Sequence, residues 1–267
     1  MKIGFLITAR LKSTRLPFKL LMDLNGRSMV EHVIDRAKKT AGIDEIVLCT
    51  SNNNQDRPLI ERAFQNNIYY FLGDEMDVLK RLNDAANYFD LDYIINITGE
   101  NPLFSISDAN RVVDSIKTKR SDFTYIEGLP IGCAVYGIKV KALNLVCNIK
   151  KEVDTEIWGP LINKPDVFSV EAITVDDFYK RPSLRLTNDY IEDYKLMQTI
   201  FRHFPFGSTP SLMEVLELLD TNPEYLKING ERKQAALDED IVKKIDKFYK
   251  DNHNQIIELK NRIYNDN

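Results

Sequence analysis

The amino-acid sequence predicts an α/β fold with a mostly parallel sheet, and three observations lead to that prediction. Short apolar runs alternate with amphipathic helical patterns through the first half of the chain. Each apolar run is continuous, which is typical of a strand whose two faces are both covered by helices. The 267 residues are 43% hydrophobic and 28% charged, the composition of a globular chain that can bury a sizeable core.

The first half of the chain divides into alternating strands and helices. Strands are expected at residues 2–8, 45–50, 68–71 and 92–97, and helices at residues 29–40, 57–66, 77–88 and 107–118. The helix at 29–40 illustrates the pattern, because Met29 and Val33 lie on one apolar stripe. Ligands of such sheets bind beyond the carboxyl ends of the strands, so a site is expected just after Thr8, Thr50 and Ile97.

The second half of the chain is less regular. Strands are expected at residues 123–125, 133–138, 167–172 and 185–187, and helices at residues 139–147, 191–203 and 211–219. The tail at 238–267 places Ile241, Ile245 and Phe248 among charged residues, which predicts an amphipathic C-terminal helix. That helix must dock on its own domain or on a partner subunit. We therefore expect one α/β domain at 1–237 and a helical tail at 238–267.

Charge, hydropathy and cysteine content limit the partners and the compartment. The 36 Lys and Arg residues against 40 Asp and Glu residues give a net charge of −4, which disfavours a nucleic-acid binder. No stretch approaches the roughly 20 apolar residues of a membrane span, so no membrane partner is expected. The apolar N-terminus is short and is expected to be a strand and not a signal peptide. Cys49, Cys133 and Cys147 lack disulfide or metal spacing, which favours a cytoplasmic protein.

A basic loop follows the first expected strand, at residues 9–19. It holds Arg10, Lys12, Arg15 and Lys19 together with two hydroxyl side chains. Main-chain N–H groups in such a loop can form an anion-binding concavity while the cations neutralise charge. The alternative is a solvated basic loop. A Walker-type NTPase is not indicated, because the Gly-x-x-x-x-Gly-Lys-Ser/Thr pattern is missing.

Five stretches of the sequence carry a resemblance to a known family. The run Ala-Arg-x-x-Ser-Thr-Arg-Leu-Pro-x-Lys at 9–19 resembles the nucleotide-binding signature of CTP-dependent cytidylyltransferases. That group makes CMP-sugars and includes the 3-deoxy-manno-octulosonate and sialic-acid enzymes. The chain most resembles the spore-coat polysaccharide biosynthesis SpsF type. Further matches follow in order at residues 73–81, 97–103, 185–193 and 219–229, so the likeness spans residues 1 to about 230.

The resemblance implies a fold and an activity. It implies a three-layer α/β/α Rossmann-like nucleotidyltransferase domain, often a homodimer, with an acceptor and dimerisation region at about 125–180. The implied reaction transfers CMP from CTP to a sugar or sugar-like acceptor and releases pyrophosphate, for surface glycan biosynthesis. Mg²⁺ is the implied cofactor. The alternatives are a glycosyltransferase-like enzyme that uses a nucleotide sugar and a non-catalytic nucleotide-binding relative.

The resemblance also implies roles for individual residues at the nucleotide. Arg10, Lys19 and Arg15 are implied to be catalytic, as cations that clamp the triphosphate. Nucleotide binding is implied for Ala9, Arg10, Leu11, Lys12, Ser13, Lys19, Thr50, Ser51, Gly73, Asp77, Thr98 and Gly99. Main-chain N–H groups of residues 11–13 are expected to cradle phosphate oxygens. Three of these roles have alternatives. Arg15 could form a salt bridge within the loop, and Asp77 could be a helix N-cap. Residues 50–51 could be an ordinary strand cap.

Glu100 and Asp189 are the metal candidates by the same resemblance. Mg²⁺ takes one or two carboxylates together with phosphate oxygens and water. Glu100 stands where the family carries Asp, so its longer side chain would place the metal further out or reach it through water. Asp189 has an alternative role in capping the helix at 191–203. A glycosyltransferase would usually hold its metal with an Asp-x-Asp pair, but the residue two positions after Glu100 is Pro102.

The acceptor region departs from the family pattern. Tyr136, Glu156 and Trp158 are expected to contact the acceptor, with core packing as the alternative for Trp158. The segments that hold them, 129–136 and 154–160, lack the acidic and the Arg- or His-containing runs that the family commonly has. A further departure is Phe18, which stands where the family usually has glycine before Lys19.

Overall fold

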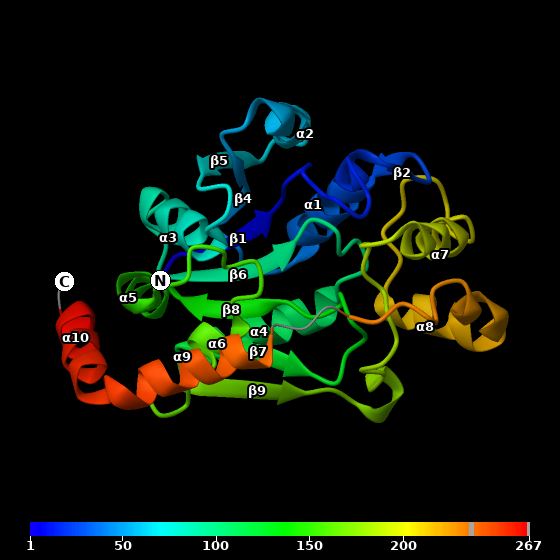
Figure 1. Ribbon diagram of the computed structural model, residues 1–267. Helices are drawn as coiled ribbons and strands as arrows, with labels where there is room; N and C mark the ends of the chain where they lie inside the picture. Colours follow the sequence, from blue (N-terminus) through cyan, green and yellow to red (C-terminus); the bar gives the residue numbers. More distant parts are fainter. Residues whose placement is uncertain (235–237, 266–267) are drawn as a thin grey trace.

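The molecule is built on one seven-stranded sheet (Figure 1). A computed structural model describes residues 1–234 and 238–265. The strands are β1 (Ile3–Thr8), β4 (Glu45–Ser51), β5 (Tyr69–Gly73), β6 (Tyr93–Thr98), β7 (Phe123–Glu127), β8 (Tyr136–Lys139) and β9 (Val170–Thr174). Their order in the sheet is β5-β4-β1-β6-β8-β7-β9.

The sheet is mostly parallel, as expected. β1 pairs in parallel with β4 and β6, and β4 pairs in parallel with β5. Only β8 runs against its neighbours β6 and β7, while β9 is parallel to β7. The carboxyl ends of β1, β4, β5 and β6 therefore meet at one edge of the sheet. A short ribbon of β2 (Asp23–Leu24) and β3 (Arg27–Ser28) lies outside the sheet.

Helices cover both faces of the sheet and form three layers, which confirms the predicted fold. Successive residues of β1 show the two faces, because Phe5 and Ile7 belong to one buried cluster and Leu6 to the other. The first cluster includes side chains of α1 (Met29–Lys39), α2 (Arg57–Gln65), α4 (Ile106–Lys119), α7 (Ile191–Phe201) and α8 (Leu212–Thr221). The second includes side chains of α3 (Val78–Tyr88), α5 (Val140–Ile149), α6 (Gly159–Ile162), α9 (Glu239–Asp251) and α10 (His253–Asn265).

Local capping residues fix where several helices begin. Ser28 and Glu31 form a capping box at the start of α1, so two of its free N–H groups are satisfied. Asp77 accepts a hydrogen bond from the main-chain N–H of Lys80 at 3.0 Å and caps α3. Ser105 caps α4, because its side chain accepts from the main-chain N–H of Asp108.

The C-terminal segment forms two helices and not one. α9 ends at Asp251 and is capped by Asn252, whose side chain donates to the carbonyl of Phe248 at 2.8 Å; α10 then turns toward α5 (Figure 1). Tyr249 and Ile256 are buried in the same cluster as α5 and α6. Lys260 forms an ion pair with Asp122 at 3.0 Å. The tail therefore docks on its own chain, which is the first of the two expected alternatives.

The expected strand at 185–187 is wrong. Arg185 makes only an isolated bridge to Ile131, and the main-chain N–H of Leu186 donates to the Ile131 carbonyl at 2.9 Å. Pairing stops there because the next residues turn into the N-terminus of α7. Among the described residues, no helix combines the length and the apolar character that a membrane span requires.

Candidate active site

A cavity of about 470 Å³ opens at the carboxyl edge of the sheet. Four separate parts of the chain form its wall: the basic loop after β1, the end of β6, the start of α3 and the segment between α5 and α6. The basic loop therefore faces the position where an α/β sheet binds its ligand. This is the location that the sequence predicts for the loop, just after the end of β1.

Many of the expected site residues meet in this cavity. The residues on its wall are Ala9, Arg10, Lys12, Ser13, Arg15, Lys19, Thr98, Glu100, Glu156 and Trp158, joined by Thr8, Thr14, Met76, Val78 and Arg81. The expected residues that do not line it are Leu11, Thr50, Ser51, Gly73, Asp77, Gly99, Tyr136 and Asp189. Several of this second group contact residues that form the cavity, as Asp189 does with Lys19 and Tyr136 with Trp158.

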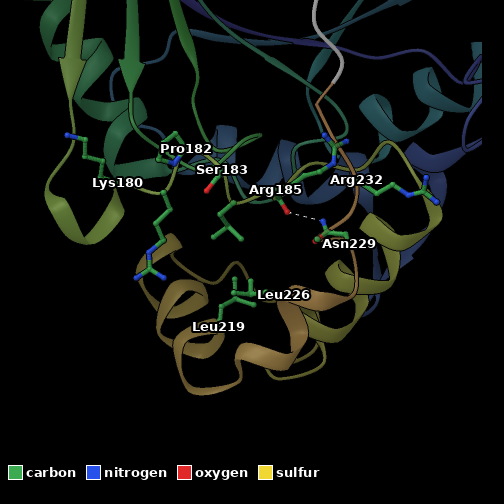
Figure 2. A pocket seen from close by; sticks show the side chains of 11 residues that line it. Lys180, Pro182, Ser183, Arg185, Leu219, Leu226, Asn229 and Arg232 are labelled. Carbon is green, nitrogen blue, oxygen red and sulfur yellow. Dashed lines mark hydrogen bonds between the residues drawn. The ribbon is translucent and has the colours of Figure 1, made fainter.

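A second hollow, of about 450 Å³, lies between residues 180–185 and the end of α8 (Figure 2). Figure 2 shows Leu219 and Leu226 across the hollow from Ser183 and Arg185. Three of its arginines pair with carboxylates: Arg181 with Asp220, Arg185 with Asp193 and Arg232 with Glu192. The first cavity lies at the carboxyl edge of the sheet, where an α/β sheet binds its ligand, and it is therefore the candidate active site.

Lys19 and Asp189 form a buried ion pair beside the cavity. Lys19 is only 7% exposed, and its Nζ lies 3.1 Å from Oδ1 of Asp189. The same oxygen accepts from Arg15 Nη2 at 2.9 Å, and Oδ2 accepts from Arg185 Nη2 at 2.6 Å. Burial acts to raise the pKa of Asp189, but Lys19 and Arg185 hold that pKa below its usual value. Asp189 is thus an ionised carboxylate that orients three cations.

The structure decides two of the open alternatives at this cluster. The N-terminus of α7 is satisfied by Asp193, whose Oδ2 accepts from the main-chain N–H groups of Asp189 and Tyr190. Asp189 itself is therefore not the capping residue. Arg15 does form a salt bridge, but its partner is Asp189, near the start of α7, and not a residue of the basic loop.

Glu100 presents a free carboxylate to the cavity. Within residues 1–234 and 238–265, its side chain has no ion-pair or hydrogen-bond partner. Its main-chain carbonyl accepts from the N–H of Asn188 at 3.2 Å, which brings Asp189 to the same side of the cavity. The described residues contain no cluster of three or more His, Cys, Asp or Glu side chains suited to a metal. Two carboxylates fit Mg²⁺ only if substrate phosphates and water complete the shell.

The basic loop is held by its own main chain and by Asp56. Oδ1 of Asp56 accepts from the Leu11 N–H at 2.7 Å, and the Ser13 N–H donates to the Leu11 carbonyl at 3.0 Å. Two of the three N–H groups expected to cradle phosphate are therefore engaged inside the protein. Oδ2 of Asp56 accepts from Ser51 Oγ at 2.5 Å. Asp56 is fully buried and ties the loop to the end of β4, a role that no local sequence pattern indicates.

Arg81 of α3 is a further cation at the cavity. It is 1% exposed and lines the cavity, and its Nη1 donates to the carbonyls of Asp74 and Glu75. Burial lowers its pKa, and the nearby Arg10 acts in the same direction. Gly73 makes room for it, because a Cβ at Gly73 would lie 2.8 Å from Arg81 Cγ.

The segment between α5 and α6 is tied to the start of α3. Asp77 pairs with Lys150 and accepts from Thr155 Oγ1 at 2.9 Å, in addition to capping α3. This positions Glu156, whose Oε2 lies 3.6 Å from Arg10 Nη2. Trp158 packs edge-to-face against Tyr136 with ring centroids 5.1 Å apart, so it is both a core residue and a part of the cavity wall.

Comparison with known proteins agrees with this arrangement. The model of the cytidylyltransferase family matches residues 5–202. The chain belongs to the cytidylyltransferase family. It is therefore a nucleotidyltransferase, and the family match covers the basic loop, Glu100 and Asp189.

Relatives of this cytidylyltransferase match most of its length. It is 30% identical over 238 residues to an uncharacterized protein of Methanocaldococcus jannaschii, covering 88% of this chain and 98% of the relative. It is 27% identical over 232 residues to the spore coat polysaccharide biosynthesis protein SpsF of Bacillus subtilis, covering 83% and 95%. An 8-amino-3,8-dideoxy-manno-octulosonate cytidylyltransferase of Shewanella frigidimarina is 29% identical over 126 residues, covering 46% and 51%.

Solved structures share the fold. A cytidylyltransferase from Leptospira borgpetersenii superposes with a TM-score of 0.78 at 23% identity, covering 88% of this chain and 100% of that one. A CMP:2-keto-3-deoxy-manno-octonic acid synthetase in complex with CTP superposes with a TM-score of 0.61 at 16% identity, covering 76% and 99%. The cytidylyltransferase fold therefore extends over the sheet and the helices that form the cavity.

Proposed function

We propose that this cytidylyltransferase transfers CMP from CTP to a hydroxyl group of a sugar or sugar-like acceptor and releases pyrophosphate. The observation that carries the proposal is the cationic wall of the cavity, in which Arg10, Arg15 and the buried Lys19 converge at the carboxyl end of β1. A triphosphate is the substrate group with enough negative charge to engage such a wall. The family of the chain and the names of its relatives support CTP as the donor.

The reaction needs alignment and neutralisation of charge more than covalent help from the protein. The acceptor oxygen attacks the α-phosphorus, forming an O–P bond while the bond from that phosphorus to the pyrophosphate oxygen breaks. The acceptor proton leaves to solvent. Lys19, Arg15 and Arg10 bind phosphate oxygens and stabilise the charge that grows on the leaving pyrophosphate. Trp158 and Glu156, which also line the cavity, contact the acceptor.

Mg²⁺ belongs to the same proposal. Glu100 would hold it as an unpaired carboxylate on the wall. Asp189 would join Glu100 once phosphate oxygens engage Lys19 and Arg15, the cations that now contact its Oδ1. When bound, the ion supplies further neutralisation of the triphosphate charge. A homodimer and a cytoplasmic role in surface glycan biosynthesis are part of the proposal, the latter supported by the name of the SpsF relative.

The proposal is tested by following pyrophosphate release from CTP and Mg²⁺ with a panel of sugar and sugar-acid acceptors. Binding of CTP is measured separately by its effect on the melting temperature. Lys19→Gln is expected to weaken CTP binding by about tenfold or more, since a buried charge-assisted contact is lost. Lys119→Gln is the matched control, because Lys119 is exposed, pairs with Glu171 and does not line the cavity.

Two results would contradict the proposal. One is a protein that neither releases pyrophosphate with any acceptor nor is stabilised by CTP. The other is a clear preference for a nucleotide sugar over CTP, which would favour a glycosyltransferase-like activity. Equal CTP affinity in Lys19→Gln and in the parent protein would contradict the role of the basic loop.

A further inference from the structure

Two guanidinium groups converge on one carbonyl at the cavity wall. Nη1 of Arg10 lies 2.6 Å from the carbonyl oxygen of Glu75, and Nη1 of Arg81 lies 3.3 Å from the same oxygen. Both arginines line the cavity. Two like charges that share one acceptor repel each other, so an anion beside them would stabilise both.

Arg81 lacks a carboxylate partner. No Asp or Glu of residues 1–234 and 238–265 lies within ion-pair distance of it, although it is 1% exposed. Its Nη1 donates to the carbonyls of Asp74 and Glu75, and its Nε has no hydrogen-bond partner within the described part of the chain. A buried cation in this state is a strong attractor for an anionic ligand group.

One carboxylate does reach Arg10, and it belongs to Glu156. Its Oε2 lies 3.6 Å from Arg10 Nη2. The contact is weak, because the Glu156 side chain is 66% exposed and the separation is long for an ion pair.

The backbone on both sides of Glu156 is anchored. Thr155 is 1% exposed and donates to Asp77 at 2.9 Å, while Trp158 is 6% exposed within the aromatic cluster. The Glu156 side chain can therefore swing into solvent by rotamer change alone, with no movement of the segment that carries it.

We propose that Glu156 is an internal stand-in for the anionic group of the substrate, which displaces it from Arg10 on binding and then lies beside both Arg10 and Arg81. The inference rests on the proposed function, because it takes that anion to be the triphosphate of CTP. It adds Arg81 to the phosphate-binding groups. It also means that removing the Glu156 carboxylate strengthens ligand binding, whereas removing an ordinary binding residue weakens it, because this carboxylate competes with the ligand.

The test compares the affinity of the full-length protein for inorganic pyrophosphate and for CTP, by titration calorimetry, in two variants. Glu156→Gln removes the competing charge and is expected to tighten binding of both ligands about two- to fivefold, the range set by a weak exposed ion pair. Asp154→Asn is the matched control. It removes the same charge two residues away, from a carboxylate that pairs with no cation in the described residues, and is expected to leave both affinities unchanged.

A double variant tests whether the effect passes through Arg10. In an Arg10→Ala background, Glu156→Gln is expected to change pyrophosphate affinity no further, because the contact that it removes is already lost. Trp158 is the only tryptophan of the chain, so its emission confirms that the wall of the cavity is intact in each variant.

The outcomes separate the inference from the proposed function. Unchanged or weaker binding in Glu156→Gln overturns the inference and leaves the proposed function standing if the parent protein still binds CTP. Equal tightening in Asp154→Asn also overturns it, because the effect would then be one of overall charge. Failure of the parent protein to bind CTP or pyrophosphate overturns the proposed function, and the inference with it.

Discussion

Asp189 offers the sharpest test of how the site is held together. In Asp189→Asn, the shape of the side chain is kept and its negative charge is removed. Arg185 retains Asp193, whose Oδ1 lies 2.9 Å from its Nε, and Arg15 is exposed enough to be solvated. Lys19 alone is left buried without a carboxylate.

The cost of that change follows from the burial of Lys19. Removing one partner of a buried ion pair costs about 3–5 kcal/mol, because the other charge stays in the protein interior. Of the three cations that contact Asp189, Arg185 keeps its ion pair with Asp193 and Arg15 is solvated. The amide oxygen of asparagine also still accepts one hydrogen bond. We therefore expect a loss near the lower end, about 3 kcal/mol of unfolding free energy.

Urea unfolding followed by circular dichroism measures this loss. Asp84→Asn is the control, since it removes the same charge from the exposed Lys80–Asp84 pair on α3, where about 0.3–0.5 kcal/mol is expected. Adding Lys19→Met to Asp189→Asn is expected to recover part of the loss, because the unpaired charge is then gone. Equal destabilisation by the Asp189 and Asp84 substitutions would refute the claim that Asp189 neutralises a buried cation.

Two further predictions follow from the same geometry. Because the folded-state pKa of Asp189 lies below its unfolded value, the stability that this carboxylate contributes is complete above about pH 4 and is lost as the pH falls through the folded-state pKa. The difference in unfolding free energy between the parent protein and Asp189→Asn, measured in urea from pH 6 downward, should therefore become smaller on acidification. A difference that stays constant with pH would contradict the ion pair. Phe18 has a φ of 56°, in the left-handed region where glycine carries no steric penalty. Phe18→Gly is expected to be more stable than Phe18→Ala by about 1 kcal/mol in thermal unfolding, and equal stability would show that this conformation costs nothing.

Local patterns in the sequence were enough to predict the layered fold. The apolar run of β1 and the stripe of α1 are properties of neighbouring residues, so periodicity alone predicts a buried strand followed by a covering helix. The basic loop after β1 was also predictable in place, because parallel strands present their carboxyl ends to the ligand. The strand expected at 185–187 did not form, because it lacks a neighbour with which to continue pairing beyond the single bridge to Ile131.

The chemistry of the cavity was decided by contacts between distant parts of the chain. Lys19 and Asp189 are 170 residues apart in sequence, and Leu11 and Asp56 are 45 apart. Nothing in the local sequence distinguishes Asp56 from a solvated carboxylate or Arg81 from a cation on an exposed helix face. Only the packing of α3 against the sheet buries Arg81, and only the path of the segment before α6 places Glu156 on Arg10.

The sequence by itself therefore determined which elements form and where the positive charge gathers. Tertiary structure determined which carboxylate neutralises each cation and which cation is left for a ligand. The physical reason is that periodicity and capping depend on residues within a turn or two of one another, whereas desolvation and ion pairing depend on how the whole chain closes around a group.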